Sequence, residues 1–231
     1  MEDVAIYGAG GFGCEVHDIL EQGERFRPVL FLDSDPEKHG TTVAGLPVEG
    51  GLERIEVLLR SGVRHVVVAI GDNVTRAAHA ETLQAHGMEL VSAIHPLSNI
   101  SPSATIGRHV IIGPRATICV HAQVGPHAVL SAGAIAEHDN VIGVAAFLGP
   151  AVRLAGTVTV CDFAVLEIGA TVIPGRTVGY GAYVQAGAVV IHDVPANVRV
   201  TGAPAVPLGT VQPRFVPDPA PVSTPPGQLV R

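Results

Sequence analysis

The chain has 231 residues, of which 47% are hydrophobic, 15% charged and 4% aromatic, with 27 Gly and 18 Pro. Because helix interiors avoid Gly and Pro, this composition excludes a helical bundle or coiled coil and favours strands joined by turns. The net charge of −7 offers no basic surface to nucleic acid, so we expect no nucleic-acid partner.

Neither a targeting segment nor a disulfide pattern is evident. The start of the sequence lacks a basic region followed by an apolar stretch, and no segment has the continuous apolar character of a membrane span. The chain has an odd number of cysteines, namely Cys14, Cys119 and Cys161, and none of them are in CxxC spacing. This argues against a set of disulfides and against a zinc-cysteine site. We expect a cytoplasmic protein without a membrane partner, whose cysteines are small buried residues.

The first part of the chain alternates between strand-like and helix-like segments. Strands are expected at residues 4–7, 29–32 and 66–70, and helices at residues 14–24, 51–60 and 74–86. This alternation predicts a small parallel sheet with helices outside it. We therefore expect a Rossmann-like α/β domain over residues 1–90, connected to the following part by residues 88–93.

A glycine-rich loop follows the first expected strand. Gly8, Gly10 and Gly13 form a GxGxxG pattern, in which backbone N–H groups and a helix N-terminus can hold a phosphate. Asp33 stands at the end of the next expected strand and can accept hydrogen bonds from a ribose or a base. Three strands are only half of a dinucleotide-binding fold. The pattern thus favours a mononucleotide diphosphate over NAD, with a purely structural turn as the other alternative.

The middle of the chain contains a hexapeptide repeat. From Ile94 to Val190, all but one of the positions taken at every sixth residue hold Ile, Leu or Val, and Ala recurs two positions earlier. Gly or Pro often follows the aliphatic residue, so each hexapeptide predicts a short strand and a corner, and three hexapeptides close a coil. The repeat therefore predicts a β-helix of a little over five coils, within a second domain spanning residues 91–205.

A polar run interrupts the aliphatic column. Ala136 is followed by Glu137, His138, Asp139 and Asn140, whose side chains should point outward at a corner. His138 can accept a proton at neutral pH, and Asp139 can orient its ring and raise its basicity. This pair is the best general-base candidate in the chain, and a solvated surface histidine is the alternative.

The end of the chain is rich in proline. From Pro207 to Arg231, proline is the commonest amino acid, with Ser, Thr and Gly among the rest. Such a segment cannot readily bury its backbone, so residues 206–231 are expected to form an extended or disordered tail without a catalytic role.

Five short elements together carry a family resemblance: GAGGFG at 8–13, FLDS at 31–34, IGDN at 70–73, EHD at 137–139 and GAPA at 202–205. With them the chain resembles the bacterial nucleotide-sugar N-acetyltransferases, which acetylate UDP- or GDP-linked 4-amino sugars. A nearby branch comprises sialic acid O-acetyltransferases. The resemblance implies an α/β nucleotide-sugar domain, a left-handed parallel β-helix, a homotrimer, and acetyl-CoA along the coils at the subunit boundary.

The resemblance also implies residue roles. His138 would be the base and Asp139 the residue that raises its basicity. The residues implied for the nucleotide-sugar are Gly8, Ala9, Gly10, Asp33, Ser34 and Gly71, those for acetyl-CoA are Phe147, Ile168 and Ala186, and no metal is implied. Ile168 and Ala186 are separated by three hexapeptides and should stack on successive coils. The family commonly has His where this chain has Phe12 and Phe147.

Other chemistries remain as alternatives. Direct acetyl transfer is favoured over an acyl-enzyme on Cys119 or Cys161, because no histidine is evident in their corners. His109 and His127 lie one coil apart and could bind a metal, but two exposed corner residues are the simpler interpretation. A sugar O-acetyltransferase and a non-catalytic β-helix, the latter suggested by the two Phe replacements, are also open.

Overall fold

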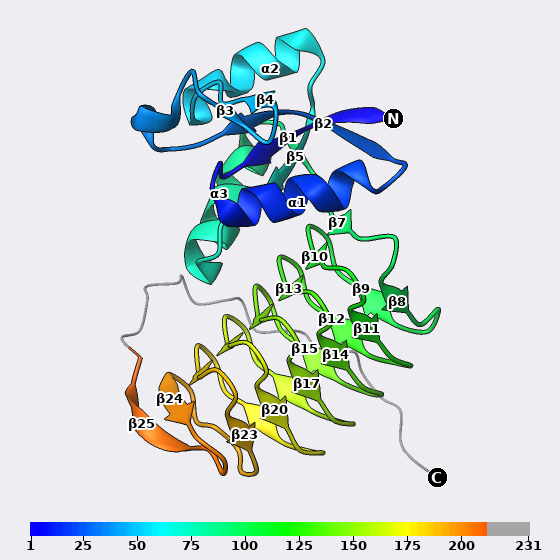
Figure 1. Cartoon of the computed structure of the whole chain (residues 1–231), viewed down its shortest axis with the longest axis vertical. Coiled ribbons are helices and arrows are strands. Elements are labelled where there is room, and N and C mark those ends of the chain that lie inside the picture. The colour runs from blue at the N-terminus through cyan, green and yellow to red at the C-terminus, as the bar shows by residue number, and fades with distance from the viewer. Residues whose placement is uncertain (212–231) are drawn as a thin grey trace.

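The chain forms an α/β domain that sits on one end of a stack of coils (Figure 1). The computed structural model describes residues 1–211, so the predicted tail lies outside the described residues from residue 212 onward. The predicted fold class, a Rossmann-like domain followed by a parallel β-helix, is confirmed. Among residues 1–211, no helix has the length and apolar character needed to cross a bilayer.

The N-terminal domain is a four-stranded parallel sheet with helices on both faces. Its strand order is β2 (Phe26–Leu32), β1 (Glu2–Tyr7), β5 (His65–Val68) and β6 (Glu89–Leu90). Its helices are α1 (Gly11–Glu21), α2 (Ile55–Ser61) and α3 (Asn73–Ala85), and its shorter elements are the 3-10 turns Pro36–Lys38 and Leu52–Arg54 and the hairpin β3 (Thr42–Val43) and β4 (Leu46–Pro47). The fourth strand, β6, was not predicted. It is two residues long and lies within residues 88–93, which were expected to connect the two domains.

Successive side chains of β1 point to opposite faces of the sheet, and each face is covered by different helices. Val4 and Ile6 pack against α1, whereas Ala5 and Tyr7 pack with α2 and α3. A strand that is buried on both faces is apolar throughout, and this is why residues 4–7 could be recognised in the sequence.

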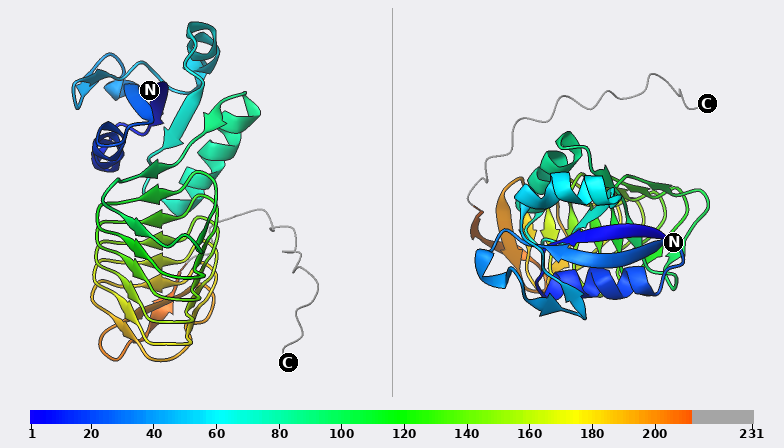
Figure 2. Two further views of the ribbon diagram at one scale, coloured as in Figure 1. Left: turned by 90° about the vertical axis from the view of Figure 1, so that its right-hand side faces the viewer. Right: turned by 90° about the horizontal axis from the view of Figure 1, so that it is seen from above.

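The second domain is a three-sided solenoid, and the parallel strands of its coils form one sheet on each of the three sides (Figure 2). The first solenoid sheet contains β7 (Ala93–Ile94), β10 (Ile111–Ile112), β13 (Val129–Leu130), β16 (Phe147–Leu148), β19 (Val165–Leu166), β22 (Tyr183–Val184), β24 (Val198–Thr201) and β25 (Val206–Thr210). The second contains β8 (Asn99–Ile100), β11 (Thr117–Ile118), β14 (Ile135–Ala136), β17 (Arg153–Leu154), β20 (Thr171–Val172) and β23 (Val189–Val190). The third contains β9 (Thr105–Ile106), β12 (Gln123–Val124), β15 (Val141–Ile142), β18 (Thr159–Val160) and β21 (Thr177–Val178).

The predicted aliphatic column fills the interior of the solenoid. Each of its members is the second residue of a strand, and Ile112, Leu130 and Leu148 are completely buried together with the members of the Ala column from Ala116 to Ala188. Full burial of one such side chain contributes about 1.5–3 kcal/mol. At the end of the stack Ile94 is 39% exposed, because no further coil lies above it.

The stack continues beyond Val190, where the repeat was expected to end. β24 adds a seventh parallel strand to the first solenoid sheet, and β25 pairs with it in antiparallel orientation. Residues 206–210 are therefore a strand and not the start of an extended tail. The edge of β24 offers unpaired backbone groups to any following segment, and an edge strand tolerates Pro207.

Candidate active site

The glycine loop lies at the carboxyl edge of the N-terminal sheet. Gly8, Ala9 and Gly10 follow β1 directly, and α1 begins at Gly11. A Cβ atom at Gly13 would lie 1.9 Å from the carbonyl oxygen of Gly8, so only glycine lets the helix start this close to the loop. The N-terminus of α1 therefore faces the edge at which parallel α/β sheets bind ligands.

Asp33 fixes this loop to the end of β2. It is 7% exposed, and its carboxylate accepts hydrogen bonds from the backbone N–H of Ala9 (2.8 Å), from that of Asp35 (2.9 Å) and from the ammonium of Lys38 (2.8 Å). Burial opposes ionisation, but the bonds from Lys38, Asp35 and Ala9 outweigh it and lower the pKa of Asp33. Asp33 is thus an anion at neutral pH, and Ser34 lies exposed beside it.

The third strand end completes this edge. Backbone N–H groups of Gly8 and Ala69 donate to Leu32 and Tyr7 at 2.7 Å, which holds the ends of β1, β2 and β5 together. Gly71 follows in the loop between β5 and α3. The structure therefore brings together all six residues predicted to contact the nucleotide-sugar, namely Gly8, Ala9, Gly10, Asp33, Ser34 and Gly71.

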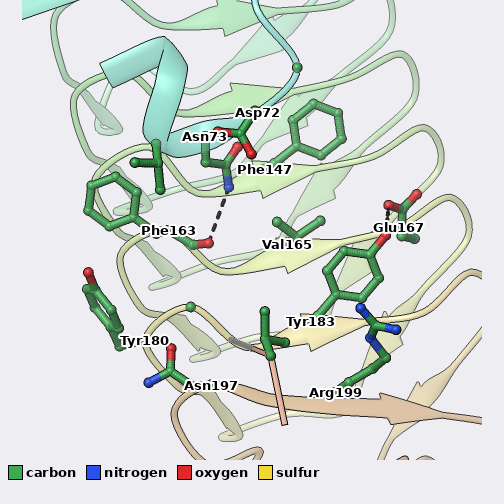
Figure 3. A pocket seen from close by; sticks show the side chains of 14 residues that line it. Asp72, Asn73, Phe147, Phe163, Val165, Glu167, Tyr180, Tyr183, Asn197 and Arg199 are labelled. Carbon is green, nitrogen blue, oxygen red and sulfur yellow. Dashed lines mark hydrogen bonds between the residues drawn. The ribbon is translucent and has the colours of Figure 1, made fainter. Parts of the chain in front are cut away.

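A cavity of about 340 Å³ lies between the loop that carries Gly71 and the first solenoid sheet (Figure 3). Its walls include Gly71 and Asp72 from the N-terminal domain and Phe147, Phe163 and Tyr183 from the solenoid. One residue predicted for the nucleotide-sugar and one predicted for acetyl-CoA therefore line the same space.

The cavity has an aromatic wall and a polar end. Phe163 and Tyr180 form an edge-to-face pair, with ring centroids 5.8 Å apart. At the polar end the hydroxyl of Tyr183 donates to Glu167, and the guanidinium of Arg199 lies 5.0 Å from the Tyr183 ring centroid. Burial and the bond to Glu167 raise the pKa of Tyr183 to about 12, so its hydroxyl stays protonated at neutral pH.

Phe147 was expected at this site from the sequence, whereas Val165 and Tyr183 were missed, although the repeat contained a signal for them. Phe147, Val165 and Tyr183 recur at intervals of one coil, and each precedes the aliphatic column by one position. This spacing places all three on the outer surface of the first solenoid sheet.

His138 and Asp139 form the predicted pair at the corner between β14 and β15. Nδ1 of His138 lies 2.8 Å from one Asp139 oxygen, and Nδ1 of His121 lies 3.4 Å from the other. The bond from His138 lowers the pKa of Asp139, which is therefore an anion at neutral pH. Because Asp139 engages Nδ1, the basic nitrogen of His138 is Nε2.

Two neighbours of this pair were missed in the sequence, although both follow the period of the coil. His121 precedes Asp139 by one coil, and Gly156 follows His138 by one coil. A Cβ atom at Gly156 would lie only 2.3 Å from Nε2 of His138. The absence of a side chain at Gly156 therefore leaves room for the imidazole.

The three residues predicted to contact acetyl-CoA lie on or beside the first solenoid sheet. Ile168 and Ala186 follow strands of this sheet on adjacent coils, and the N–H of Gly187 donates to the carbonyl of Ile168 at 2.9 Å. Their predicted stacking is confirmed, and the Ile168 residue is 55% exposed. Their corner joins the first and second sheets, whereas the corner of His138 joins the second and third. A single chain therefore does not bring His138 to the cavity.

Phe12 and Phe147, the two positions at which the resemblance implies His, contact one another. The rings of Phe12 and Phe147 pack edge to face with centroids 6.4 Å apart. Both rings also pack against the core between α1 and the first solenoid sheet. The two replacements thus form one apolar contact between the domains.

Two expectations about individual side chains are wrong. Cys14 is exposed because it lies on the outer side of α1, and Cys119 and Cys161 are half-buried. His109 and His127 are buried and not exposed, because the N-terminal domain covers their corner. Within residues 1–211, no group of three or more His, Cys, Asp or Glu could hold a metal ion.

Comparison with known proteins identifies the relatives of this chain. Residues 3–83 match the family model of the PglD N-terminal domain. GDP-perosamine N-acetyltransferase of Escherichia coli O157:H7 is 30% identical over 223 residues, covering 89% of this chain and 96% of that protein. UDP-N-acetylbacillosamine N-acetyltransferase of Bacillus subtilis (strain 168) is 34% identical over 114 residues, and this match spans 48% of the chain and about half (51%) of that relative.

A solved structure also matches this chain over nearly its whole length. The crystal structure of PerB from Caulobacter crescentus, in complex with CoA and GDP-perosamine, is 38% identical with a TM-score of 0.85, covering 90% of this chain and 98% of that one. Both domains and their arrangement are therefore shared. This chain belongs to the nucleotide-sugar N-acetyltransferase family.

Proposed function

We propose that this protein transfers the acetyl group of acetyl-CoA to the amine of a UDP- or GDP-linked 4-amino sugar. The observation that supports this most strongly is the cavity shared by Gly71 and Phe147. It joins the ligand-binding edge of an α/β sheet to the surface of a β-helix, as a two-substrate transfer requires. The relatives named above acetylate sugars of this class.

The nucleotide would lie along the carboxyl edge of the N-terminal sheet, with its phosphates at the N-terminus of α1. The residues proposed to bind it are Gly8, Ala9, Gly10, Asp33 and Ser34. Gly71 would then direct the sugar into the cavity. The pantetheine arm of acetyl-CoA would follow the corner formed by Ile168 and Ala186 and place the thioester near Phe147.

The charges of the cavity suit an amine. Asp72 and Glu167 place two carboxylates in its lining, against the one guanidinium of Arg199, and Tyr183 supplies a neutral hydroxyl. Carboxylates attract an amino group and its ammonium form more strongly than they attract a hydroxyl. This environment favours N-acetylation over O-acetylation.

The proposed reaction is a direct transfer. The amine nitrogen attacks the thioester carbonyl, Nε2 of His138 takes the proton that the nitrogen loses, and the C–S bond then breaks. The same proton can return to the departing thiolate, while the anionic Asp139 stabilises the imidazolium. Burial raises the pKa of Cys119 and of Cys161, so both thiols stay protonated and are poor nucleophiles.

A neighbouring subunit would supply the base. Because one chain holds His138 and the cavity at different places, we propose a homotrimer in which the His138 corner of one chain meets the cavity of the next. The exposed Ile168 would then lie in the interface. Both proposed substrates are cytoplasmic metabolites, which is why we place the enzyme in the cytoplasm.

An assay of thiol release from acetyl-CoA tests the function. Purified protein is supplied with a panel of UDP- and GDP-linked amino sugars, beside His138→Ala. We expect release that depends on one amino sugar and falls about 10²–10⁴-fold in the variant, the usual contribution of a general base. Equal activity in the variant would remove His138 from the mechanism, and no release with any sugar would contradict the proposed function.

A further inference from the structure

The N-terminal domain is docked on one corner of the solenoid, between the third and first sheets. His109, His127, Ala145 and Phe163 occupy the same position on four successive coils, with φ angles of 53°, 61°, 53° and 58°. All four residues thus adopt the left-handed backbone conformation. We call these four residues the docking corner.

Polar side chains of α3 donate to three of the four carbonyls of the docking corner. Arg76 donates to the carbonyls of His127 (3.2 Å) and Ala145 (3.0 Å), and the amide of Asn73 donates to that of Phe163 (3.3 Å; Figure 3). On the first coil, the N–H of Val68 donates to Nε2 of His109 (2.9 Å). Four consecutive coils therefore each bond to residues 68–76.

Arg76 also bonds to the loop that lines the cavity. Its Nη1 atom donates to the carbonyls of Ile70 (3.0 Å) and Gly71 (3.2 Å), and its Nη2 atom donates to the side-chain oxygen of Asn73 (2.8 Å). The Arg76 residue is completely buried. Burial lowers the pKa of Arg76 to about 9, and its oxygen acceptors favour the cation, so it is charged at neutral pH.

We propose that Arg76 is a positioning residue for substrate binding, which sets the conformation of the loop at residues 70–73 by bonding it to the docking corner. This inference rests on the proposed function, because it assigns the loop to the nucleotide-sugar. A planar guanidinium bonds to two loop carbonyls and two corner carbonyls at once, and no other side chain has donors in that arrangement. The solenoid, which carries the acetyl-CoA residues, thereby determines where the sugar enters the cavity.

Arg76→Lys and Arg76→Met separate positioning from simple stability. Lysine keeps the charge but has three donors on a point-like ammonium, and methionine keeps the apolar stem alone. Ser92→Ala is the matched control, because Ser92 also bonds one coil to the next, accepting from the N–H of Val110 at 3.0 Å, but contacts neither the loop nor the cavity.

The first readout is steady-state kinetics. We expect Arg76→Met to raise KM for the nucleotide-sugar about tenfold, because the two bonds that fix the carbonyls of Ile70 and Gly71 are lost, and Arg76→Lys to raise it less. KM for acetyl-CoA should change less than about twofold, and Ser92→Ala should change neither constant. Equal increases in both constants, or no increase in either, would contradict the proposal.

The second readout does not depend on activity. Hydrogen exchange of the amides of residues 70–75 should accelerate in Arg76→Met and Arg76→Lys, while exchange within the solenoid interior stays as in the wild type. Unchanged exchange in the loop would overturn the positioning role. If the wild-type protein transfers no acetyl group, the proposed function fails, and the exchange result still decides whether Arg76 holds the loop.

Discussion

His138 is surrounded by residues from three coils. Asp139 engages its Nδ1 atom within its own coil, His121 contacts the other oxygen of Asp139 from the coil before, and Gly156 faces its Nε2 atom from the coil after. His138, the proposed base, is half-exposed, so these contacts and not burial determine its orientation. Its environment can therefore be changed without disturbing the core.

Substituting Gly156→Ala should impair catalysis and leave the fold intact. The new Cβ atom would displace the imidazole from its place beside Asp139, and we expect kcat to fall about tenfold or more because a general base acts only within hydrogen-bond reach. Steady-state kinetics and a thermal unfolding curve measure the two effects.

The double variant provides the control for Gly156→Ala. In a His138→Ala background no imidazole remains to be displaced, so adding Gly156→Ala should cause no further loss. An additional loss of the same size would mean that Gly156 acts through something other than the base.

The docking corner contains two histidines, His109 and His127, that are neutral at neutral pH. Nε2 of His109 accepts from Val68, so its Nδ1 carries the proton and donates to Nδ1 of His127 at 2.8 Å. Burial and the nearby charges lower the pKa of His109 to about 3, and burial with Arg108 and Arg76 lowers that of His127 to about 4. Protonation of either ring would break this arrangement.

The free energy of unfolding should therefore fall in mild acid. The unfolded histidines bind protons below pH 6.5 and the folded ones do not, so the stabilisation is complete above pH 6.5 and is lost as the pH falls toward 4. At pH 5 the loss should be about 1–2 kcal/mol per histidine. Denaturant unfolding at pH 7 and pH 5 measures it.

The comparison variant is His127→Gln. It should be less stable than the wild type at pH 7 but should lose less stability between pH 7 and pH 5, because one titrating group is gone. An identical loss in both proteins would show that these histidines do not cause the acid sensitivity.

The sequence predicted regular elements better than isolated contacts. Residues 4–7 and the aliphatic column are defined by burial patterns that repeat locally, so β1 and the solenoid strands could be placed in advance. β6 could not, because it spans only Glu89–Leu90 and forms by pairing with β5, which lies on the other side of α3 in the chain. β25 could not, because it is exposed throughout and has no alternating pattern of its own. Arg76 was also missed, since its partners become neighbours only when the two domains pack.

The residues proposed for the site lie at two different edges of the solenoid. His138 and Ile168 are separated by five hexapeptides, which is not a whole number of coils, whereas Ile168 and Ala186 are separated by three hexapeptides, or one coil. The sequence therefore contained the separation of the residue proposed as the base from the residues proposed to contact acetyl-CoA. It did not contain the cavity, which requires the docked N-terminal domain.

Mixing two inactive variants tests the claim that one chain supplies the base and another the cavity. His138→Ala removes the base, and Gly71→Phe fills the cavity, since no atom lies within 4 Å of a Cβ atom built at Gly71. Each variant alone should be inactive. When equal amounts are co-expressed and assembled at random, about a quarter of the sites should combine an intact base with an intact cavity and restore about a quarter of wild-type activity. No recovery in verified mixed oligomers would contradict the claim, because it would mean that base and cavity come from the same chain.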